Sequence, residues 1–275
     1  IKAIHGGGGR GMRIVASLEE LDDDYERCQS EARLAFGNGD VYVEQRITRA
    51  RHIEIQIVGD GSGDVIALGE RECSLQRRHQ KLVEIAPAPF LPEALRQRLT
   101  ASALEMAKAI KYVSLGTFEF LVDAENLSDE SPFAFIEANA RLQVEHTVTE
   151  EVMGVDLVQT QILIAAGAAL ADVGLDSDKP LNPRGFAIQT RINMEVMKAD
   201  GTTKPTGGVL TTFEPSSGPG IRVDTFGYAG YQTSPSYDSL LAKQIVHSHS
   251  ADFSVALAKA YRALCEFRID GLQTN

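Results

Sequence analysis

Apolar and polar residues alternate in short runs along the chain, and longer amphipathic runs separate them. A two-residue alternation is typical of strands with one buried face, whereas a 3.6-residue period is typical of helices. Strands are predicted at residues 1–4, 12–15, 41–47, 52–58, 64–72, 116–124 and 131–145. Helices are predicted at residues 17–36, 92–110, 154–167 and 250–267. Because these elements do not follow a regular strand–helix–strand order, the pattern favours an α+β fold with mainly antiparallel pairing.

Turn and capping signals locate the connections between these elements. The GDGSG segment at residues 59–63 predicts a hairpin between two of the strands. Ser17 and Glu20 have the spacing of a capping box at the start of the first helix. Residues 73–89 are basic and end in a proline-rich run, so we expect them to be irregular.

Charge and cysteine content narrow the possible partners and compartment. The 275-residue chain has a net charge of -11, which argues against nucleic acid or an anionic membrane as a partner. No apolar run is long enough to span a bilayer. Three widely spaced cysteines form neither a disulfide framework nor a zinc pattern, so a reducing compartment is expected. The chain begins without methionine, inside a predicted strand, and is therefore expected to be an internal piece of a longer protein.

The first candidate site is the glycine-rich segment near the start of the chain, where five of residues 6–11 are glycine. Such loops let backbone N–H groups approach phosphate. Gly6, Gly8 and Gly11 satisfy the spacing of the dinucleotide-binding fingerprint, but that motif needs a helix after its last glycine. Here an apolar, strand-like segment follows. We therefore expect a lid over phosphates, with Lys2 supplying charge; the alternative is a plain surface hairpin.

The second candidate site is the segment IEANARLQVEH, in which five long polar residues alternate with apolar ones. With a two-residue period, one face of a strand would carry Glu137, Asn139, Arg141, Gln143 and Glu145. An ordinary strand with one wet face is the alternative. Glu119, in GTFEF on the predicted partner strand, is placed to join Glu137 and Asn139 in an oxygen-only site suited to Mg²⁺.

The same segment has the groups needed to handle a small anion. A guanidinium binds planar oxyanions in fork geometry, so Arg141 and Gln143 suit such a ligand. Glu145, next to that ligand, is placed to act as a base. The basic run QRRHQK at residues 76–81 either faces an anion or is a solvated surface.

Together these segments resemble the biotin carboxylase component of biotin-dependent carboxylases, an ATP-grasp family. The resemblance covers nearly the whole chain and runs through KAIHGGGGRGMR, RHIEIQIVGDGSGDVIALGERECSLQRRHQKLVEIAPAP, GTFEFL, FIEANARLQVEH, RGFAIQTRIN and SYDSLLAKQIVH. It implies an ATP-grasp fold followed by the biotin carboxylase C-terminal subdomain, with the N-terminal subdomain missing. Residues 1–46 would be the remainder of the lid subdomain, 47–170 the catalytic subdomain, and 184–275 an incomplete C-terminal subdomain.

The resemblance also implies a role for each matching residue. The nucleotide and phosphate contacts would come from Lys2, Gly7, Gly8, Gly9, Glu44, Ile47, His52, Gln76, His79 and Lys81. The metal ligands would be Glu119, Glu137 and Asn139, and the bicarbonate cradle Arg141, Gln143 and the backbone of Val144. Glu145 would be the base that deprotonates bicarbonate, and Arg191 would stabilise the biotin enolate.

The implied reaction is a ligase reaction that carboxylates biotin through carboxyphosphate. It uses ATP, Mg²⁺ or Mn²⁺ and bicarbonate, and the biotin is attached to a carrier domain outside this chain. The carrier and a carboxyltransferase are the implied partners, on the same polypeptide or on other subunits, in a homo-oligomer within a larger complex. An acyl-CoA carboxylase is favoured over a pyruvate carboxylase. The expected location is cytoplasmic, with the mitochondrial matrix and plastids left open.

Two other interpretations compete with this one. A different ATP-grasp ligase, such as the carbamoyl-phosphate synthetase large chain, shares the glycine lid and the glutamate–asparagine metal pair. RLQVEH together with QRRHQK favours biotin carboxylase over it. A non-catalytic nucleotide-binding or scaffold module predicts the loss of key charged residues. Those residues are all present: Glu119, Glu137, Arg141, Glu145 and Arg191. The isolated chain is nevertheless expected to be inactive if the missing subdomain completes the ATP site.

Overall fold

The structure is a computed structural model that describes residues 1–6, 11–77, 79–125, 127–176, 179, 181–234 and 236–275. The chain forms two compact units. The smaller consists of residues 1–49 and 76–80, and the larger of residues 50–75 and 81–275. Among the described residues, no helix is both long and apolar enough to cross a membrane.

The smaller unit pairs two short strands beside one helix. Strand β1 (Lys2–Ala3) lies antiparallel to β2 (Val41–Tyr42), and helix α1 (Leu21–Phe36) follows a 3-10 turn at Leu18–Glu20. The strand predicted at 12–15 is wrong as an element, because only a single bridge, from Lys2 to Met12, forms there. The strand predicted at 41–47 is likewise reduced to its first two residues.

The start of α1 also differs from the prediction. The Ser17 side chain makes no capping hydrogen bond, so the expected capping box does not form. At the other end the helix stops at Gly37, whose φ of 76° is readily adopted only without a side chain.

Most of the larger unit is built on an eight-stranded sheet in the order β12-β13-β8-β5-β4-β3-β6-β7. Its strands, in chain order, are β3 (Ala50–Asp60), β4 (Val65–Arg77), β5 (Gln80–Ala86), β6 (Val113–Asp123), β7 (Phe133–Asn139), β8 (Phe186–Asn193), β12 (Ile221–Thr225) and β13 (Leu240–Ser248). Two small antiparallel pairs flank it: β9 (Glu195–Met197) with β10 (Thr203–Pro205), and β11 (Thr212–Glu214) with β14 (Arg268–Asp270). The registered pairings are antiparallel, which confirms the predicted α+β class.

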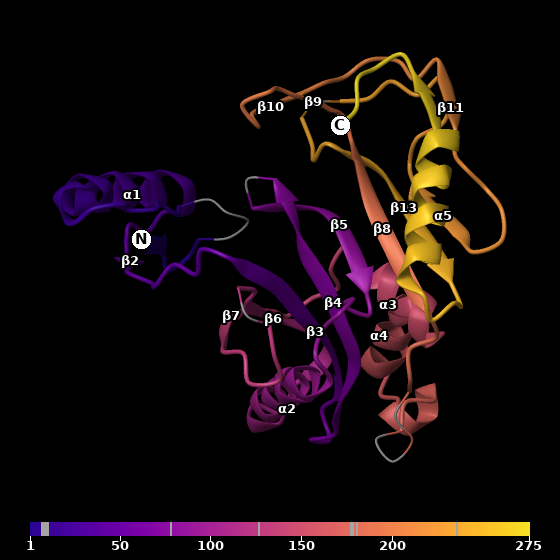
Figure 1. The fold of residues 1–275 in the computed structure, drawn as a ribbon, viewed down its shortest axis with the longest axis horizontal. Helices are drawn as coiled ribbons and strands as arrows, with labels where there is room; N and C mark the ends of the chain where they lie inside the picture. Colours follow the sequence, from indigo (N-terminus) through magenta and orange to yellow (C-terminus); the bar gives the residue numbers. More distant parts are fainter. Residues whose placement is uncertain (7–10, 78, 126, 177–178, 180, 235) are drawn as a thin grey trace. The chain divides into compact units, whose positions relative to one another are not determined.

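The helices of the larger unit pack on the sheet (Figure 1). They are α2 (Glu93–Ala109), α3 (His146–Met153), α4 (Leu157–Ala165) and α5 (Phe253–Glu266), with a 3-10 turn at Leu170–Val173. Helix α2 covers Ile53, Ile55 and Ile57 of β3, together with Phe118 and Phe120 of β6. Helix α5 packs in the same way on β8 and β13.

Strand alternation turns the intervening residues to the opposite side of the sheet. Val58 of β3 packs there with Leu157 of α4, and Ala187 of β8 packs with Val148 of α3. Polar residues of these strands lie on this side as well: Arg71 of β4 donates to the Thr149 hydroxyl of α3.

Two sequence predictions about this sheet are wrong. Residues 73–77 and 80–86 are not irregular but form the end of β4 and all of β5. The prediction failed because long polar side chains on these strands mask the apolar alternation. The strand predicted at 131–145 ends at Asn139, and a short helix, α3, begins at His146. The prediction missed the start of α3 because the predicted strand was extended past Asn139, the last residue that pairs with β6.

Candidate functional site

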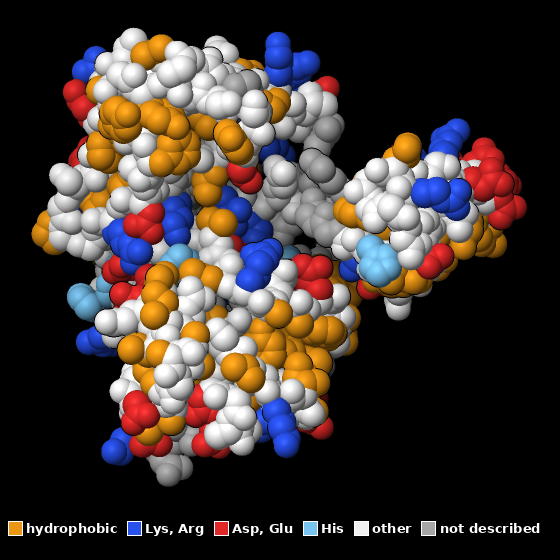
Figure 2. Space-filling model, turned by 180° about the vertical axis from the view of Figure 1, so that it is seen from behind, with side chains coloured by type: hydrophobic (Ala, Val, Ile, Leu, Met, Phe, Trp, Pro, Cys, Tyr) orange, Lys and Arg blue, Asp and Glu red, His pale blue; other side chains and the backbone are white. Residues whose placement is uncertain are grey.

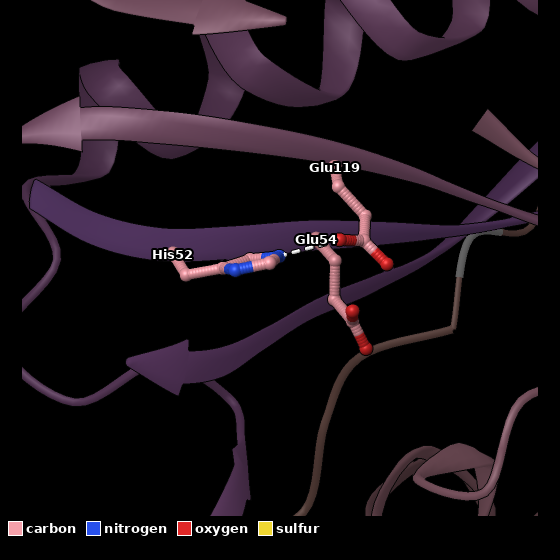
Figure 3. Close-up of side chains that lie close together, drawn as sticks. All are labelled: His52, Glu54 and Glu119. Atoms are coloured by element: carbon pink, nitrogen blue, oxygen red, sulfur yellow. Dashed lines mark ion pairs between the residues drawn. The ribbon is translucent and has the colours of Figure 1, made fainter. Parts of the chain in front are cut away.

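Neighbouring strands bring the acidic residues together. Glu54 of β3 pairs directly with Glu119 of β6, and Glu119 pairs with Glu137 of β7. The predicted approach of Glu119 and Glu137 across the strand pair is therefore confirmed. His52 lies two residues before Glu54 on the same face of β3, and its Nε2 is 2.7 Å from Glu119 Oε2 (Figure 3).

Lys81 of β5 neutralises three of the carboxylates at once. Its Nζ lies 2.5 Å from Glu54 Oε2, 3.1 Å from Glu119 Oε1 and 2.5 Å from Glu145 Oε1. Burial opposes the charged ammonium, but the surrounding carboxylates outweigh that effect and raise the pKa of Lys81 well above its usual value. Lys81 is therefore a fixed cation.

The ionisation of Glu119 follows from its partners. Burial opposes its charged form, but the hydrogen bond from His52 and the charge of Lys81 lower the pKa of Glu119 to about 2. The buried Glu54 behaves similarly, because Arg71 and Lys81 lower its pKa against the effect of burial. Both groups are carboxylates at neutral pH, as metal and phosphate chemistry requires.

Glu145 links Lys81 to Arg191. Besides its contact with Lys81, Glu145 accepts a hydrogen bond at Oε2 from Arg191 Nη2, at 3.0 Å. Arg191 comes from β8, and its Nε donates to Glu84 Oε1 of β5 at 2.5 Å. The structure thus brings together Lys81, Glu145 and Arg191, three residues that lie far apart in the sequence.

The segment between β7 and α3 does not follow the predicted two-residue alternation. Of the five residues expected on one strand face, only Glu137 and Asn139 lie on β7, and Arg141, Gln143 and Glu145 follow its end. Glu145 instead precedes the first residue of α3, with φ of -80° and ψ of 0°. The loop still converges on the site, because Gln143 Nε2 donates to Glu119 Oε1 at 2.9 Å.

Within this loop the Arg141 side chain is exposed, whereas the Val144 backbone is held by a residue of another strand. Arg141 is exposed, and its guanidinium contacts Leu142 O at 3.3 Å and Asn139 Oδ1 at 3.4 Å. The carbonyl of Val144 accepts a hydrogen bond from Lys243 Nζ of β13 at 2.9 Å. Lys243 thereby fixes the backbone next to Glu145 from the neighbouring strand.

The oxygen atoms at the start of this loop fit a hard divalent cation. Asn139 Nδ2 lies 3.0 Å from Glu119 Oε1 and 3.1 Å from Glu137 Oε1, so one amide faces both carboxylates. Turning that amide would present its oxygen instead, which gives the oxygen-only donors that Mg²⁺ and Mn²⁺ prefer. His52, Glu54 and Glu119 are also close enough to share an ion. There, however, the Lys81 ammonium already supplies the positive charge.

Sequence reasoning missed several buried polar residues around the site. Arg71 is fully buried and donates to Glu54, to Gln56 Oε1 at 2.7 Å, and to the hydroxyls of Thr117 and Thr149. Glu54 shares a face of its strand with His52, so the HIEIQ alternation could have identified it. No comparable local signal identifies Arg71.

The remaining predicted residues lie in the smaller unit, where Lys2 Nζ is 3.9 Å from Glu44 Oε2. Ile47 and Gln76 are half-buried, and His79 is exposed in the turn before β5 with φ of 65°. Gly7, Gly8 and Gly9 lie outside the described residues.

Charges of both signs are interleaved on the surface of the larger unit. Figure 2 shows Lys and Arg side chains next to Asp and Glu side chains across the middle of that unit. Within the larger unit, Arg222 pairs with Asp224 and with Glu150 of α3 at 2.8 Å each. Because this surface is not uniformly basic, it does not favour a polyanionic partner.

Comparisons with known proteins agree with this arrangement. Residues 1–173 match the family described as carbamoyl-phosphate synthase L chain, ATP binding domain, and residues 189–275 match the biotin carboxylase C-terminal domain. Mitochondrial pyruvate carboxylase from Homo sapiens is 49% identical over the whole chain, which spans 22% of that protein's length.

Two solved structures are similar throughout. A biotin carboxylase from Campylobacter jejuni, in a complex with a βγ-ATP ligand, has a TM-score of 0.90 and 44% identity over 99% of this chain and 58% of that one. The biotin carboxylase domain of Hydrogenobacter thermophilus 2-oxoglutarate carboxylase, in complex with MgADP, ADP and bicarbonate, has a TM-score of 0.89 and 42% identity. It covers 99% of this chain, which spans 57% of that one. The chain therefore belongs to the biotin carboxylase family, as an ATP-grasp domain followed by a biotin carboxylase C-terminal domain.

Proposed function

We propose that the full-length protein catalyses the ATP- and bicarbonate-dependent carboxylation of biotin, the first half-reaction of a biotin-dependent carboxylase. The observation that carries this proposal is the position of Glu145, which lies just before α3 and is held between Lys81 and Arg191. The two cations hold this buried carboxylate in place near Gln143, where it can meet a small anion and receive its proton.

In the proposed reaction, a bicarbonate oxygen bonds to the terminal phosphorus of ATP while the bond to ADP breaks. Glu145 takes the bicarbonate proton, and Arg141 and Gln143 hold the anion. Lys81 offsets charge on the transferred phosphoryl group. When bound to Glu119, Glu137 and Asn139, Mg²⁺ or Mn²⁺ supplies further positive charge for the phosphate oxygens.

The carboxyphosphate formed in this way splits into CO₂ and phosphate. The phosphate then takes the proton from biotin N1′, and the resulting enolate-like biotin attacks CO₂. Arg191 is placed to stabilise that negative charge, because its guanidinium is partly exposed next to Glu145. The nucleotide contacts are proposed for His52 and, in the smaller unit, for Lys2, Gly7, Gly8, Gly9, Glu44, Ile47, Gln76 and His79.

The partners of this site are proposed from the longer relatives. A carrier domain that holds biotin and a carboxyltransferase would lie outside this chain, in a homo-oligomeric complex. Residues 1–46, 47–170 and 184–275 are the proposed lid, catalytic and C-terminal subdomains. The human relative is mitochondrial, which supports the mitochondrial matrix as an alternative to the cytoplasm.

The final acceptor is proposed to be a 2-oxo acid, with pyruvate the first candidate. The relative and one of the structures described above are named for carboxylation of pyruvate and of 2-oxoglutarate. The sequence-based preference for an acyl-CoA has no comparable support from that relative. Incubating the full-length protein with ATP, bicarbonate and either pyruvate, 2-oxoglutarate or acetyl-CoA tests this choice by product identification.

The half-reaction itself is tested by phosphate release from ATP with the full-length protein. We expect release that requires Mg²⁺, bicarbonate and biotin together. Turnover that needs ammonia instead of biotin would favour a carbamoyl-phosphate-type ligase. ATP binding without any biotin-dependent turnover would favour a non-catalytic module.

Replacing Glu137 with glutamine should weaken metal binding. The change removes one negative charge from the Glu119–Glu137–Asn139 site but keeps the side chain's shape. We expect the Mg²⁺ concentration for half-maximal phosphate release to rise by at least about tenfold. Glu130→Gln, on the exposed loop before β7, is the matched control and should leave this concentration unchanged. An unchanged Mg²⁺ requirement in Glu137→Gln would remove Glu137 from the metal site.

A further inference from the structure

Glu84 is a fully buried carboxylate beside the site that no sequence motif identified. It pairs directly with Gln189 across strands β5 and β8. Its Oε2 accepts a hydrogen bond from Gln189 Nε2 at 2.8 Å, and its Oε1 accepts one from Arg191 Nε at 2.5 Å. Thr147 of α3 donates to Gln189 Oε1, so the amide group is fixed from its other side. Glu84 is thus held rigidly against one edge of Arg191.

Arg191 is consequently fixed between two carboxylates. Glu84 accepts from its Nε, and Glu145 accepts from its Nη2 at 3.0 Å. Among the described residues, Nη1 has no hydrogen-bond partner, and 18% of the side chain is exposed. This geometry fixes the plane of the guanidinium and leaves one amino group for a substrate.

We propose that Glu84 is a positioning residue for biotin carboxylation, which orients Arg191 and shares its charge so that Glu145 remains able to accept a proton. The inference rests on the proposed function, because it assigns Glu84 a part in the same reaction. Without Glu84, Arg191 would have Glu145 as its sole carboxylate partner. A guanidinium then favours bidentate pairing, which would turn Nη1 away from the substrate and make Glu145 a weaker base.

The charge of Glu84 is set by the groups around it. Burial raises the pKa of Glu84 to about 7; the charge of Arg191 opposes this rise, and the negative charge of Glu145 adds to it. The Cys73 thiol also faces this cluster, and burial keeps it protonated by raising its pKa. Glu84 therefore gains its negative charge as the pH rises through about 7, and Arg191 is shared between two carboxylates only above that pH.

The test compares wild-type full-length protein with Glu84→Gln, using biotin-dependent phosphate release between pH 6 and pH 9. We expect the wild-type kcat to rise with pH through about 7. In Glu84→Gln, kcat at pH 8 should fall by at least about tenfold and this rise should disappear, because glutamine cannot ionise. The KM for ATP should change by less than about twofold, since the side-chain hydrogen bonds of Glu84 go to Gln189 and Arg191, which are not proposed nucleotide contacts. Glu84→Asp should restore the rise with pH.

Glu70→Gln is the matched control. Glu70 is also buried and accepts a hydrogen bond from an arginine, Arg96 Nε at 2.8 Å, but it lies outside the site. This variant should keep the wild-type pH profile. If Glu84→Gln also keeps the wild-type kcat and pH profile, the inference is overturned while the proposed function stands. If wild-type protein shows no biotin-dependent turnover at any pH, the proposed function fails and this inference fails with it.

Discussion

Replacing Glu145 with glutamine should lower biotin- and bicarbonate-dependent phosphate release by at least about a hundredfold, the scale expected for loss of a general base. An amide cannot take the bicarbonate proton at neutral pH. It also cannot satisfy both cations, because Lys81 and Arg191 each donate to a different oxygen of Glu145. One of them would face an amide N–H group instead. The measurement is kcat for phosphate release by the full-length variant at saturating biotin.

A second variant separates this effect from general damage to α3. Glu151 lies on the same helix, half-buried and 3.5 Å from Arg222, but away from Lys81 and Arg191. Glu151→Gln should keep kcat within about twofold of wild type. A Glu145→Gln protein that retains more than about a third of the wild-type rate would show that another group accepts the proton.

The sequence correctly predicted strands that bury one apolar face under a helix, because that burial produces the two-residue alternation. The hairpin of β3 and β4 is an example: Ile53, Ile55 and Ile57 alternate with polar residues because one face lies under α2. The same alternation placed Glu119 opposite Glu137 correctly. Where a strand has one apolar face and one polar face, its period identified the strand and the side chains that share a face.

The prediction failed where the polar alternation outlasts the hydrogen-bonded strand. Asn139 is the last residue of β7, yet polar and apolar residues keep alternating to Glu145. After Asn139 the chain leaves the sheet, and Glu145 is positioned by the start of α3 instead. Local periodicity cannot show where strand pairing ends, because pairing depends on the neighbouring strand.

Buried polar residues under the site could not be predicted from local patterns. Arg71 and Glu84 each lie on a strand, and the residues next to them in the sequence give no sign that these charges are buried. Their charge is tolerated because distant residues supply partners: Glu54 for Arg71, and Arg191 for Glu84. A charge in the interior requires such pairing, and only the three-dimensional arrangement shows it. These residues show that the floor of the site is an alternating series of cations and anions.

Removing the central cation of that series should have the second of the two large effects. Lys81→Met leaves Glu54, Glu119 and Glu145 close together without the ammonium that separates them. Because breaking a buried ion pair leaves uncompensated charge, we expect a loss of about 3–5 kcal/mol in the free energy of unfolding at pH 7. Phosphate release should fall by at least about a hundredfold. Equilibrium unfolding in urea and the phosphate assay measure the two effects on the same protein.

The pH dependence of that loss identifies its origin. In wild type the pKa of Glu119 is about 2, below its ordinary value of 4.5, so its ionised form stabilises the folded state above about pH 4.5. That contribution disappears as the pH falls from 4.5 towards 2. In Lys81→Met, ionised Glu119 has lost its ammonium partner, so much of this stabilisation is already missing at neutral pH. The difference in unfolding free energy between wild type and variant should therefore be largest near neutral pH and shrink below about pH 4. Lys259→Met, which removes only a hydrogen bond to a backbone carbonyl on β13, should cost about 1 kcal/mol with no such pH dependence. An equal stability loss in Lys81→Met at pH 3 and pH 7 would mean that Lys81 stabilises the fold by packing rather than by charge.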